Sequence, residues 1–297
     1  MARKKQPKRR GWLTAATADR HDLYERAVQE PQSEIDFVDR AFKERHGRLP
    51  RTMREDFCGT AYSSCTFVAR RPANWAVGVD LCRRTLEWGM QRHGLRLTPA
   101  QRKRMQWVQG DVRQAGTTPV DVLSAMNFSY YIFKTRPALL EYLRAALQNV
   151  APGGIIVMDA YGGHDSFSVQ SEERNLDGYT YHWDTARYNP ITGEVLNHIH
   201  FEFPDGTWMR KAFTYDWRLW TLPEIQEALL DAGFVKPCVY WEGTDHRTGG
   251  GNGVFRKAKV GEACAGWIAY VVAERPAAKG AAARGAKAPK ARRAKGR

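Results

Sequence analysis

The sequence predicts an α/β fold in which a mostly parallel, doubly wound sheet carries helices on both faces. Short apolar runs that end in an acidic residue alternate with helical stretches from residue 51 to residue 161. Such alternation is typical of parallel strands joined by right-handed helical crossovers. Residues 162–215 then show strand-like runs separated by Pro/Gly turns. We therefore expect one α/β domain, residues 51–275, with an antiparallel β insertion that forms a lid.

Two helices are expected before the sheet. Residues 19–46 carry apolar residues at helical spacing, and Pro31 interrupts the pattern. Because proline is not tolerated inside a helix, the pattern predicts two helices that meet at this residue. Residues 12–50 thus form a predicted helical lid ahead of the main domain.

The apolar runs of the main domain predict the order of its strands and helices. The stretches TMREDF, NWAVGVD, MQWVQGD, VDVLSAMNF and GGIIVMDAY are the expected strands. Helices are expected over 62–70 and 82–93, and a third ends at the Pro-Gly-Gly that follows residue 151. In such a sheet, ligands bind at the carboxyl ends of the strands.

The insertion is predicted to be an aromatic roof. Its runs GYTYHWDTARYN, EVLNHIHFEF and WMRKAFTYDW are separated by Pro-Ile-Thr-Gly and Pro-Asp-Gly-Thr, which are good turn signals. Residues 161–220 hold 13 of the 34 aromatic residues, about twice their share by length. An antiparallel sheet packed with aromatic rings is therefore expected above the ligand site.

The net charge of +14 is located at the two ends of the chain. Residues 1–10 and 276–297 contain Lys and Arg but no acid, and the part between them has equal numbers of acidic and basic residues. Segments of this composition cannot form a core, so residues 1–11 and 276–297 are expected to be disordered arms. They can attract polyanions weakly, or they can act only as solubilising tails.

Other classes of protein are excluded by what the sequence lacks. It has no apolar run of about 20 residues and no apolar leader at its N-terminus, so a soluble cytoplasmic protein without membrane contact is expected. The five cysteines form no CxxC pair. His198 and His200 form an HxH pair without a third ligand nearby in sequence, so no metal is expected.

The turn after the first strand, EDFCGTA, suggests a nucleoside site. Gly59 lets backbone approach a ligand, and Asp80, at the end of the second strand, can accept both ribose hydroxyls. Asp111, after the third strand, can accept from an adenine amino group. A dinucleotide site would require GxGxxG opening a helix. The absence of that motif argues against a nicotinamide oxidoreductase.

These residues resemble a known family. EDFCGTA, followed by GVD, QGD and AMNFSYY, is similar to motifs one to four of the class I S-adenosylmethionine-dependent methyltransferases. Phe57 and Ala61 stand where that family places glycines. The resemblance covers residues 50–275 and implies a Rossmann-like, seven-stranded sheet, with small-molecule N-methyltransferases closest in layout. The cofactor-binding residues that it implies are Tyr24, Glu55, Phe57, Gly59, Asp80, Leu81, Asp111, Val112, Asn127 and Phe128.

The acceptor site is expected under the aromatic roof. The candidate substrate-binding residues are Tyr179, Trp183, Tyr188, Trp217 and Arg218, and Tyr130, His164 and Asp165 are the candidate catalytic residues. Aromatic faces suit an acceptor that becomes cationic during transfer. A neutral amine needs little more than alignment, whereas a hydroxyl acceptor needs a base, for which His182 is a further candidate.

The sequence thus predicts metal-independent, in-line methyl transfer from S-adenosylmethionine to a small molecule, most readily an amine. An RNA or protein methyltransferase that docks through the basic arms stays an alternative. The motif NFSY, where base-methylating enzymes carry Asn-Pro-Pro-Tyr, and the neutral central region argue against RNA. A non-catalytic protein that binds S-adenosylmethionine is the other alternative.

Overall fold

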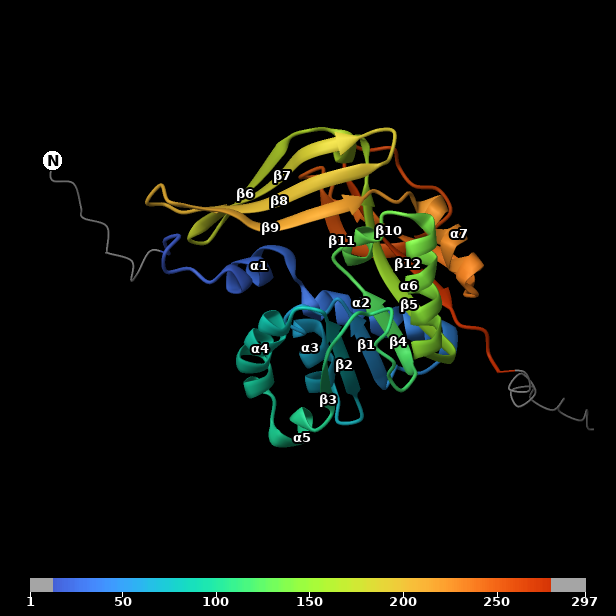
Figure 1. Ribbon diagram of the computed structural model, residues 1–297. Coiled ribbons are helices and arrows are strands. Elements are labelled where there is room, and N and C mark those ends of the chain that lie inside the picture. The colour runs from blue at the N-terminus through green and yellow to red at the C-terminus, as the bar shows by residue number, and fades with distance from the viewer. Residues whose placement is uncertain (1–12, 279–297) are drawn as a thin grey trace, which may run out of the picture.

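The computed structural model describes residues 13–278, which form a mixed main sheet flanked by helices and a separate antiparallel sheet above it (Figure 1). Within these residues the main sheet has eight strands, in the order β11-β10-β12-β5-β4-β1-β2-β3. The central strands are parallel, and β12 and β10 continue the sheet in antiparallel pairing. The strands are β1 (Thr52–Asp56), β2 (Trp75–Asp80), β3 (Met105–Gln109), β4 (Val120–Ala125), β5 (Val150–Gly162), β10 (Val235–Thr244), β11 (Gly251–Ala258) and β12 (Trp267–Glu274).

The doubly wound α/β class is confirmed, and the sheet is one strand larger than the resemblance implies. The additional strand, β11, forms a hairpin with β10 at the edge of the sheet. Its sequence, GNGVFRKA, has two glycines among its first three residues and little apolar alternation. Pairing with β10, rather than local propensity, makes this segment a strand.

Seven α-helices and three short 3-10 helices lie within residues 13–278. Pro31 occupies the first turn of α2, so the predicted break between two N-terminal helices is confirmed. In Figure 1, α6 and α7 lie to the right of the sheet and α3 and α4 to the left. The helices are α1 (Arg20–Val28), α2 (Pro31–His46), α3 (Tyr62–Arg70), α4 (Arg83–Arg92), α5 (Pro99–Arg102), α6 (Arg136–Asn149), α7 (Leu222–Ala232), η1 (Gly94–Arg96), η2 (Ser129–Ile132) and η3 (His164–Phe167).

Apolar layers cover both faces of the main sheet. On one face α6 and α7 bury Leu139, Leu143 and Leu229 against the strands. On the other face α2 buries Phe37 and Phe42. Both faces of the central strands are therefore removed from water, which explains why those strands read as continuous apolar runs.

The insertion forms the predicted lid. In residues 13–278 it is a four-stranded antiparallel sheet in the order β6-β7-β8-β9. β7 (Tyr179–Asn189), β8 (Glu194–Glu202) and β9 (Trp208–Arg218) match the three predicted runs. β6 (Ser171–Leu176) was not predicted, because SEERNL is almost entirely polar and its side chains are exposed. It is a strand because it pairs with β7 along its whole length.

The N-terminal helix α1 lies between the lid and the main domain (Figure 1). Its Leu23 and Ala27 pack against Tyr179, Ile199 and Phe201 of the lid. The space between the two sheets is thus closed on one side by α1. This arrangement places a site at the carboxyl ends of β4 and β5, beneath the lid.

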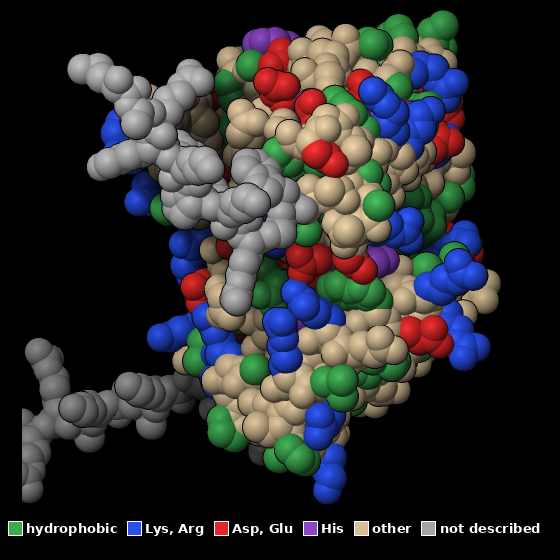
Figure 2. Space-filling model, turned by 90° about the vertical axis from the view of Figure 1, so that its left-hand side faces the viewer, with side chains coloured by type: hydrophobic (Ala, Val, Ile, Leu, Met, Phe, Trp, Pro, Cys, Tyr) green, Lys and Arg blue, Asp and Glu red, His purple; other side chains and the backbone are tan. Residues whose placement is uncertain are grey.

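The structure describes neither residues 1–12 nor residues 279–297. The first predicted basic arm, and the second from residue 279 onward, therefore lie outside the described residues. Between residues 13 and 278, none of the helices combines the length and the apolar character that crossing a bilayer requires. Lys and Arg side chains alternate with Asp and Glu over the face shown in Figure 2. The described residues on that face do not form a continuous basic track.

Candidate functional site

The turn after β1, which we call the glycine-poor turn, has left-handed backbone at three positions, one of which is a glycine. Phe57, Gly59 and Ala61 have φ angles of 57°, 53° and 54°, all in the left-handed region. This conformation is unfavourable for side-chain-bearing residues by roughly 1–2 kcal/mol each. Gly89 of α4 contacts the turn directly, because a Cβ there would lie 2.1 Å from the carbonyl oxygen of Thr60. Packing therefore holds the turn in a strained form, as is common at functional sites.

Asp80 connects the end of β2 to this turn. Its Oδ2 accepts a hydrogen bond from the amide of Gly59, and its Oδ1 accepts one from the amide of Cys82, each at 2.8 Å. The next side chain, Leu81, is 71% exposed. The carboxylate of Asp80 can bind ribose hydroxyls, and the exposed side chain of Leu81 beside it can pack against a flat base.

Glu55 lies at the end of β1 but is directed into the protein. Its Oε2 accepts hydrogen bonds from the amide of Ser64, at 2.8 Å, and from the Ser64 hydroxyl. Burial raises the pKa of the carboxyl to about 8. Glu55 therefore anchors the first turn of α3 beneath the glycine-poor turn.

Asp111 follows β3 and is paired with Arg113, whose Nη2 lies 2.7 Å from Asp111 Oδ2. This hydrogen bonding lowers the pKa of Asp111. Val112 is buried, and its carbonyl oxygen accepts a hydrogen bond from the Nη2 of Arg54 at 3.2 Å. Arg54 thus fixes the position of the Asp111–Val112 segment, which would contact an adenine.

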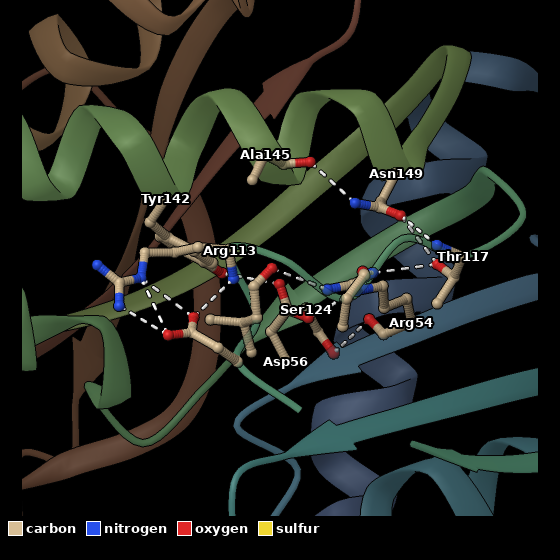
Figure 3. A network of polar contacts seen from close by, with 11 residues as sticks. Arg54, Asp56, Arg113, Thr117, Ser124, Tyr142, Ala145 and Asn149 are labelled. Atoms are coloured by element: carbon tan, nitrogen blue, oxygen red, sulfur yellow. Dashed lines mark hydrogen bonds and ion pairs between the residues drawn. The ribbon is translucent and has the colours of Figure 1, made fainter. Parts of the chain in front are cut away.

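The side chain of Arg54 makes several of the hydrogen bonds that fix the segment after β3. Its guanidinium is fully buried between β1 and α6 and pairs with Asp56 at 2.6 Å (Figure 3). It also donates to the carbonyl oxygen of Ala115 and to the hydroxyl of Thr117. Tyr142 of α6 donates to the second oxygen of Asp56. A buried charge pair with several further hydrogen bonds fixes the segment that follows β3.

The turn after β4 is a second strained segment. Asn127 and Phe128 have φ angles of 57° and 56°. Their amides donate to the two oxygens of Asp159 on β5, at 2.7 and 2.8 Å. Burial raises the pKa of Asp159 to about 7. Tyr130, a predicted catalytic residue, is fully buried, and its hydroxyl donates to the carbonyl oxygen of Asp159.

A cavity of about 350 Å³ lies between this turn, α1 and the lid; we call it the inner cavity. Six of the predicted site residues contribute to its walls: Tyr24, Asn127, Phe128, Asp165, Trp183 and Trp217. The rings of Trp183, Tyr215 and Trp217 pack against one another, with centroids 4.4 to 6.2 Å apart. The described lining includes three acids, Asp165, Glu172 and Glu242, and no Lys, Arg or His. The inner cavity therefore favours a cationic group.

Two other predicted residues line a neighbouring cavity of about 430 Å³, which we call the outer cavity. They are Tyr188 and Arg218, the latter paired with Glu224 at 2.9 Å. Tyr179 lies in neither lining, since its ring is buried in the contact between the lid and α1 and its hydroxyl donates to the carbonyl oxygen of Leu23. His164 is exposed on η3, 3.5 Å from Asp165.

The histidines of the lid lie on its other face. His182 and His200 form a cross-strand pair, whereas their neighbours Trp183 and Ile199 line the inner cavity. His182 contacts Glu202 at 3.2 Å, and His200 contacts Asp184 at 3.6 Å. Among residues 13–278, no group of three His, Cys, Asp or Glu side chains has the arrangement of a metal site.

Several lining residues were not predicted from the sequence. Tyr181 and Tyr215 share a face with Trp183 and Trp217 because strand side chains alternate, so a strict period-two reading could have found them. Tyr161 and Trp267 come together because β5 and β12 are neighbours. No local signal indicates that pairing.

Helix α1 is connected to the main domain by three acidic side chains. Asp19 accepts from the indole of Trp88 at 2.9 Å, and Asp22 pairs with Arg92. Glu25 is buried and accepts from the hydroxyl of Thr60 at 2.5 Å and contacts the Nε2 of His93 at 2.6 Å. Glu25 thus joins α1 to the glycine-poor turn.

Neither a scan against protein-family models nor a search of curated proteins gave a match. Solved structures do resemble the chain. An S-adenosylmethionine-dependent methyltransferase from Clostridium acetobutylicum has a TM-score of 0.62 and 15% identity, over 86% of this chain and 97% of that one. CalS10, an amino pentose methyltransferase from Micromonospora echinaspora, has a TM-score of 0.61 and 17% identity, over 86% and 95%.

The sugar N-methyltransferase KedS8 from a Streptoalloteichus species has a TM-score of 0.59 and 18% identity. The match covers 93% of this chain and 99% of that one. These similarities extend over nearly the whole of each solved structure. They confirm the Rossmann-like fold.

Proposed function

Since the chain has the fold of class I S-adenosylmethionine-dependent methyltransferases, we propose that it transfers a methyl group from S-adenosylmethionine to the nitrogen of a small-molecule amine. The observation that carries the proposal is the inner cavity, whose walls combine aromatic rings with three carboxylates. It lies beside the Asn127–Phe128 turn, at the edge of the sheet where this fold binds ligands. Several of the solved structures of this fold are described as sugar or glycopeptide N-methyltransferases.

The residues after β1 and β2 fit the cofactor. Asp80 is held by two amides, and a carboxylate can accept further hydrogen bonds from ribose hydroxyls. Leu81 offers an exposed apolar surface for the base. Asn127, Phe128 and Tyr24 would hold the methionine end, because they lie on the wall shared by the main domain and α1. Glu55 would act through α3, since its carboxylate is occupied by Ser64.

S-adenosylmethionine, when bound, supplies a methyl group on a positively charged sulfur. The chain's task is then to align an acceptor nitrogen with that methyl group and to exclude water. Trp183 and Trp217 provide ring faces that stabilise positive charge on the acceptor. Asp165, Glu172 and Glu242 attract an ammonium ion and can take the proton that must leave before nitrogen can attack.

Paired acceptors test the proposal. Purified protein would be incubated with methyl-labelled S-adenosylmethionine and either a primary amine or the alcohol with the same carbon skeleton. We expect label in the amine only, and loss of most of the transfer when Asp165, Glu172 and Glu242 are changed to their amides together. The proposed amine methyltransferase function would be contradicted by transfer to alcohols alone. It would also be contradicted by saturable cofactor binding without transfer to any amine.

A further inference from the structure

The outer cavity lies next to the inner cavity. Both are lined by Tyr161, Gly162, Ser166 and Trp267. A Cβ on Gly162 would lie 2.3 Å from the ring of Trp267, so this indole lies directly against bare backbone. The two cavities therefore meet at Tyr161 and Trp267, so that one extended molecule could reach both.

The outer cavity differs from the inner one in charge. Its lining is mostly apolar and includes Phe167, Tyr188 and Ile191. Its two described charged residues, Arg218 and Glu224, are paired with each other at 2.9 Å. The guanidinium of Arg218 also lies over the ring of Trp220, 3.8 Å from its centroid. The outer cavity therefore presents an apolar surface with no unpaired charge among its described residues.

The rim of the outer cavity exposes apolar side chains. Ile191, in the turn between β7 and β8, is 92% exposed, and Phe167 is 49% exposed. Turns usually carry polar residues, and this one lies over the cavity with Pro190 and Thr192 in the lining. The ring of Phe167 contacts that of Tyr188, with centroids 5.3 Å apart. Exposed apolar side chains gathered at a cavity mouth mark a surface that a ligand covers.

We propose that the outer cavity binds the neutral, apolar body of an extended amine whose nitrogen occupies the inner cavity. The inference rests on the proposed function and narrows its substrate class. The acceptor is an amphipathic molecule, cationic at one end and apolar at the other, rather than a short polar amine. Its two ends match the two cavities, acidic and aromatic inside, uncharged and apolar outside.

Two amines that differ only in their bodies test this inference. Calorimetry in the presence of S-adenosylhomocysteine would compare n-propylamine with 4-phenylbutylamine. We expect the aryl amine to bind at least tenfold more tightly to the wild type. The variant Ile191→Asp should remove most of that advantage and leave propylamine unchanged. Leu95→Asp, which alters an exposed aliphatic side chain on η1 that neither cavity includes, serves as the matched control.

The outcomes are separable. Equal affinities for the two amines, no binding of either, or an advantage that survives both Ile191→Asp and Tyr188→Ser would overturn the outer site. If Ile191→Asp instead changes only the sedimentation coefficient, the rim is a contact between copies of the chain and the inference is wrong. Absence of S-adenosylmethionine binding would overturn the proposed function itself. Thermal unfolding of each variant confirms that it is folded.

Discussion

Asp80 and Gly59 are joined by a hydrogen bond of 2.8 Å from the amide of Gly59 to the carboxylate of Asp80. Gly59 lies in the turn after β1 and Asp80 is the last residue of β2, and the bond sets the distance between them. A ligand that contacts both residues would meet a preformed surface. Preformed sites bind more tightly because less order has to be created on binding.

The first prediction concerns this carboxylate. Asp80→Ala removes the acceptor for the ribose hydroxyls and the bond that positions Gly59. We expect S-adenosylmethionine affinity to fall by about 2 kcal/mol or more, the scale of lost hydrogen bonds to a charged group. Calorimetric titration would measure the affinity, with Glu87→Ala on α4 as the control, since Glu87 is paired with the exposed Arg83. An unchanged affinity would refute the placement of the ribose.

The second prediction concerns the attachment of α1. Glu25→Ala leaves the hydroxyl of Thr60 and the ring nitrogen of His93 without this partner in a buried place. Such groups cost about 1–3 kcal/mol each. We expect the free energy of unfolding to fall by about 2 kcal/mol or more, and cofactor affinity to weaken as well.

Chemical denaturation and calorimetry would measure both effects of Glu25→Ala. Glu30→Ala is the matched control, because Glu30 is exposed at the start of α2 and its side chain makes no capping hydrogen bond. It should change neither quantity. Equal stabilities of the two variants would mean that the Glu25 contacts contribute nothing net.

The third prediction concerns pH. Burial, together with the charges of Glu34 and Asp80, raises the pKa of Glu55 to about 8, well above the ordinary glutamate value of 4.5. Between these two values the unfolded chain ionises while the folded chain keeps the proton. The contribution of Glu55 to stability is therefore fully present below pH 4.5 and is lost as the pH rises toward 8.

Glu55→Gln removes that titration. We expect the stability of the variant relative to the wild type to increase steadily from pH 5 to pH 8, measured by urea unfolding at several pH values. Asp205→Asn is the control, because the pKa of this exposed carboxyl is lowered and its effect lies below pH 4. A difference between Glu55→Gln and wild type that does not vary with pH would show that Glu55 ionises normally.

The sequence was informative wherever local pattern and strand order coincide. Asp80 and Asp111 end apolar runs and do lie at one edge of the sheet. The same logic could not show that Phe57 and Ala61 adopt left-handed backbone, because that conformation is imposed by contacts such as Gly89 against Thr60. A prediction of helices and strands alone therefore does not reveal the backbone conformation of this turn.

The acceptor site was harder to predict because it depends on distant contacts. Trp267 lines both cavities only because β12 inserts between β5 and β10. Tyr130 looked suitable for catalysis by its place after β4, yet packing turns its ring into the core. Aromatic residues on one face of a lid strand divide between cavity and core according to their position along the strand. Tyr179 and Trp183 share a face of β7, but Trp183 lines the inner cavity whereas Tyr179 packs against α1.

The fourth prediction separates acceptor binding from cofactor binding. Trp183→Leu removes an aromatic face from the inner cavity but keeps an apolar side chain. Cation–π contacts are worth about 0.5–2 kcal/mol, so KM for an amine should rise by about 2- to 30-fold. Affinity for S-adenosylmethionine should stay within about twofold, because the predicted cofactor contacts lie on other elements.

Steady-state kinetics and calorimetry would measure the two effects of Trp183→Leu. Trp183→Phe should recover most of the loss, because a phenyl ring restores the face. Trp208→Leu is the matched control within the lid, since Trp208 packs on His182 on the opposite side of the sheet. If both tryptophan-to-leucine variants raise KM equally, the effect comes from loosening the lid and not from the cavity. If Trp183→Leu alone acts and Phe restores activity, Trp183 contacts the acceptor.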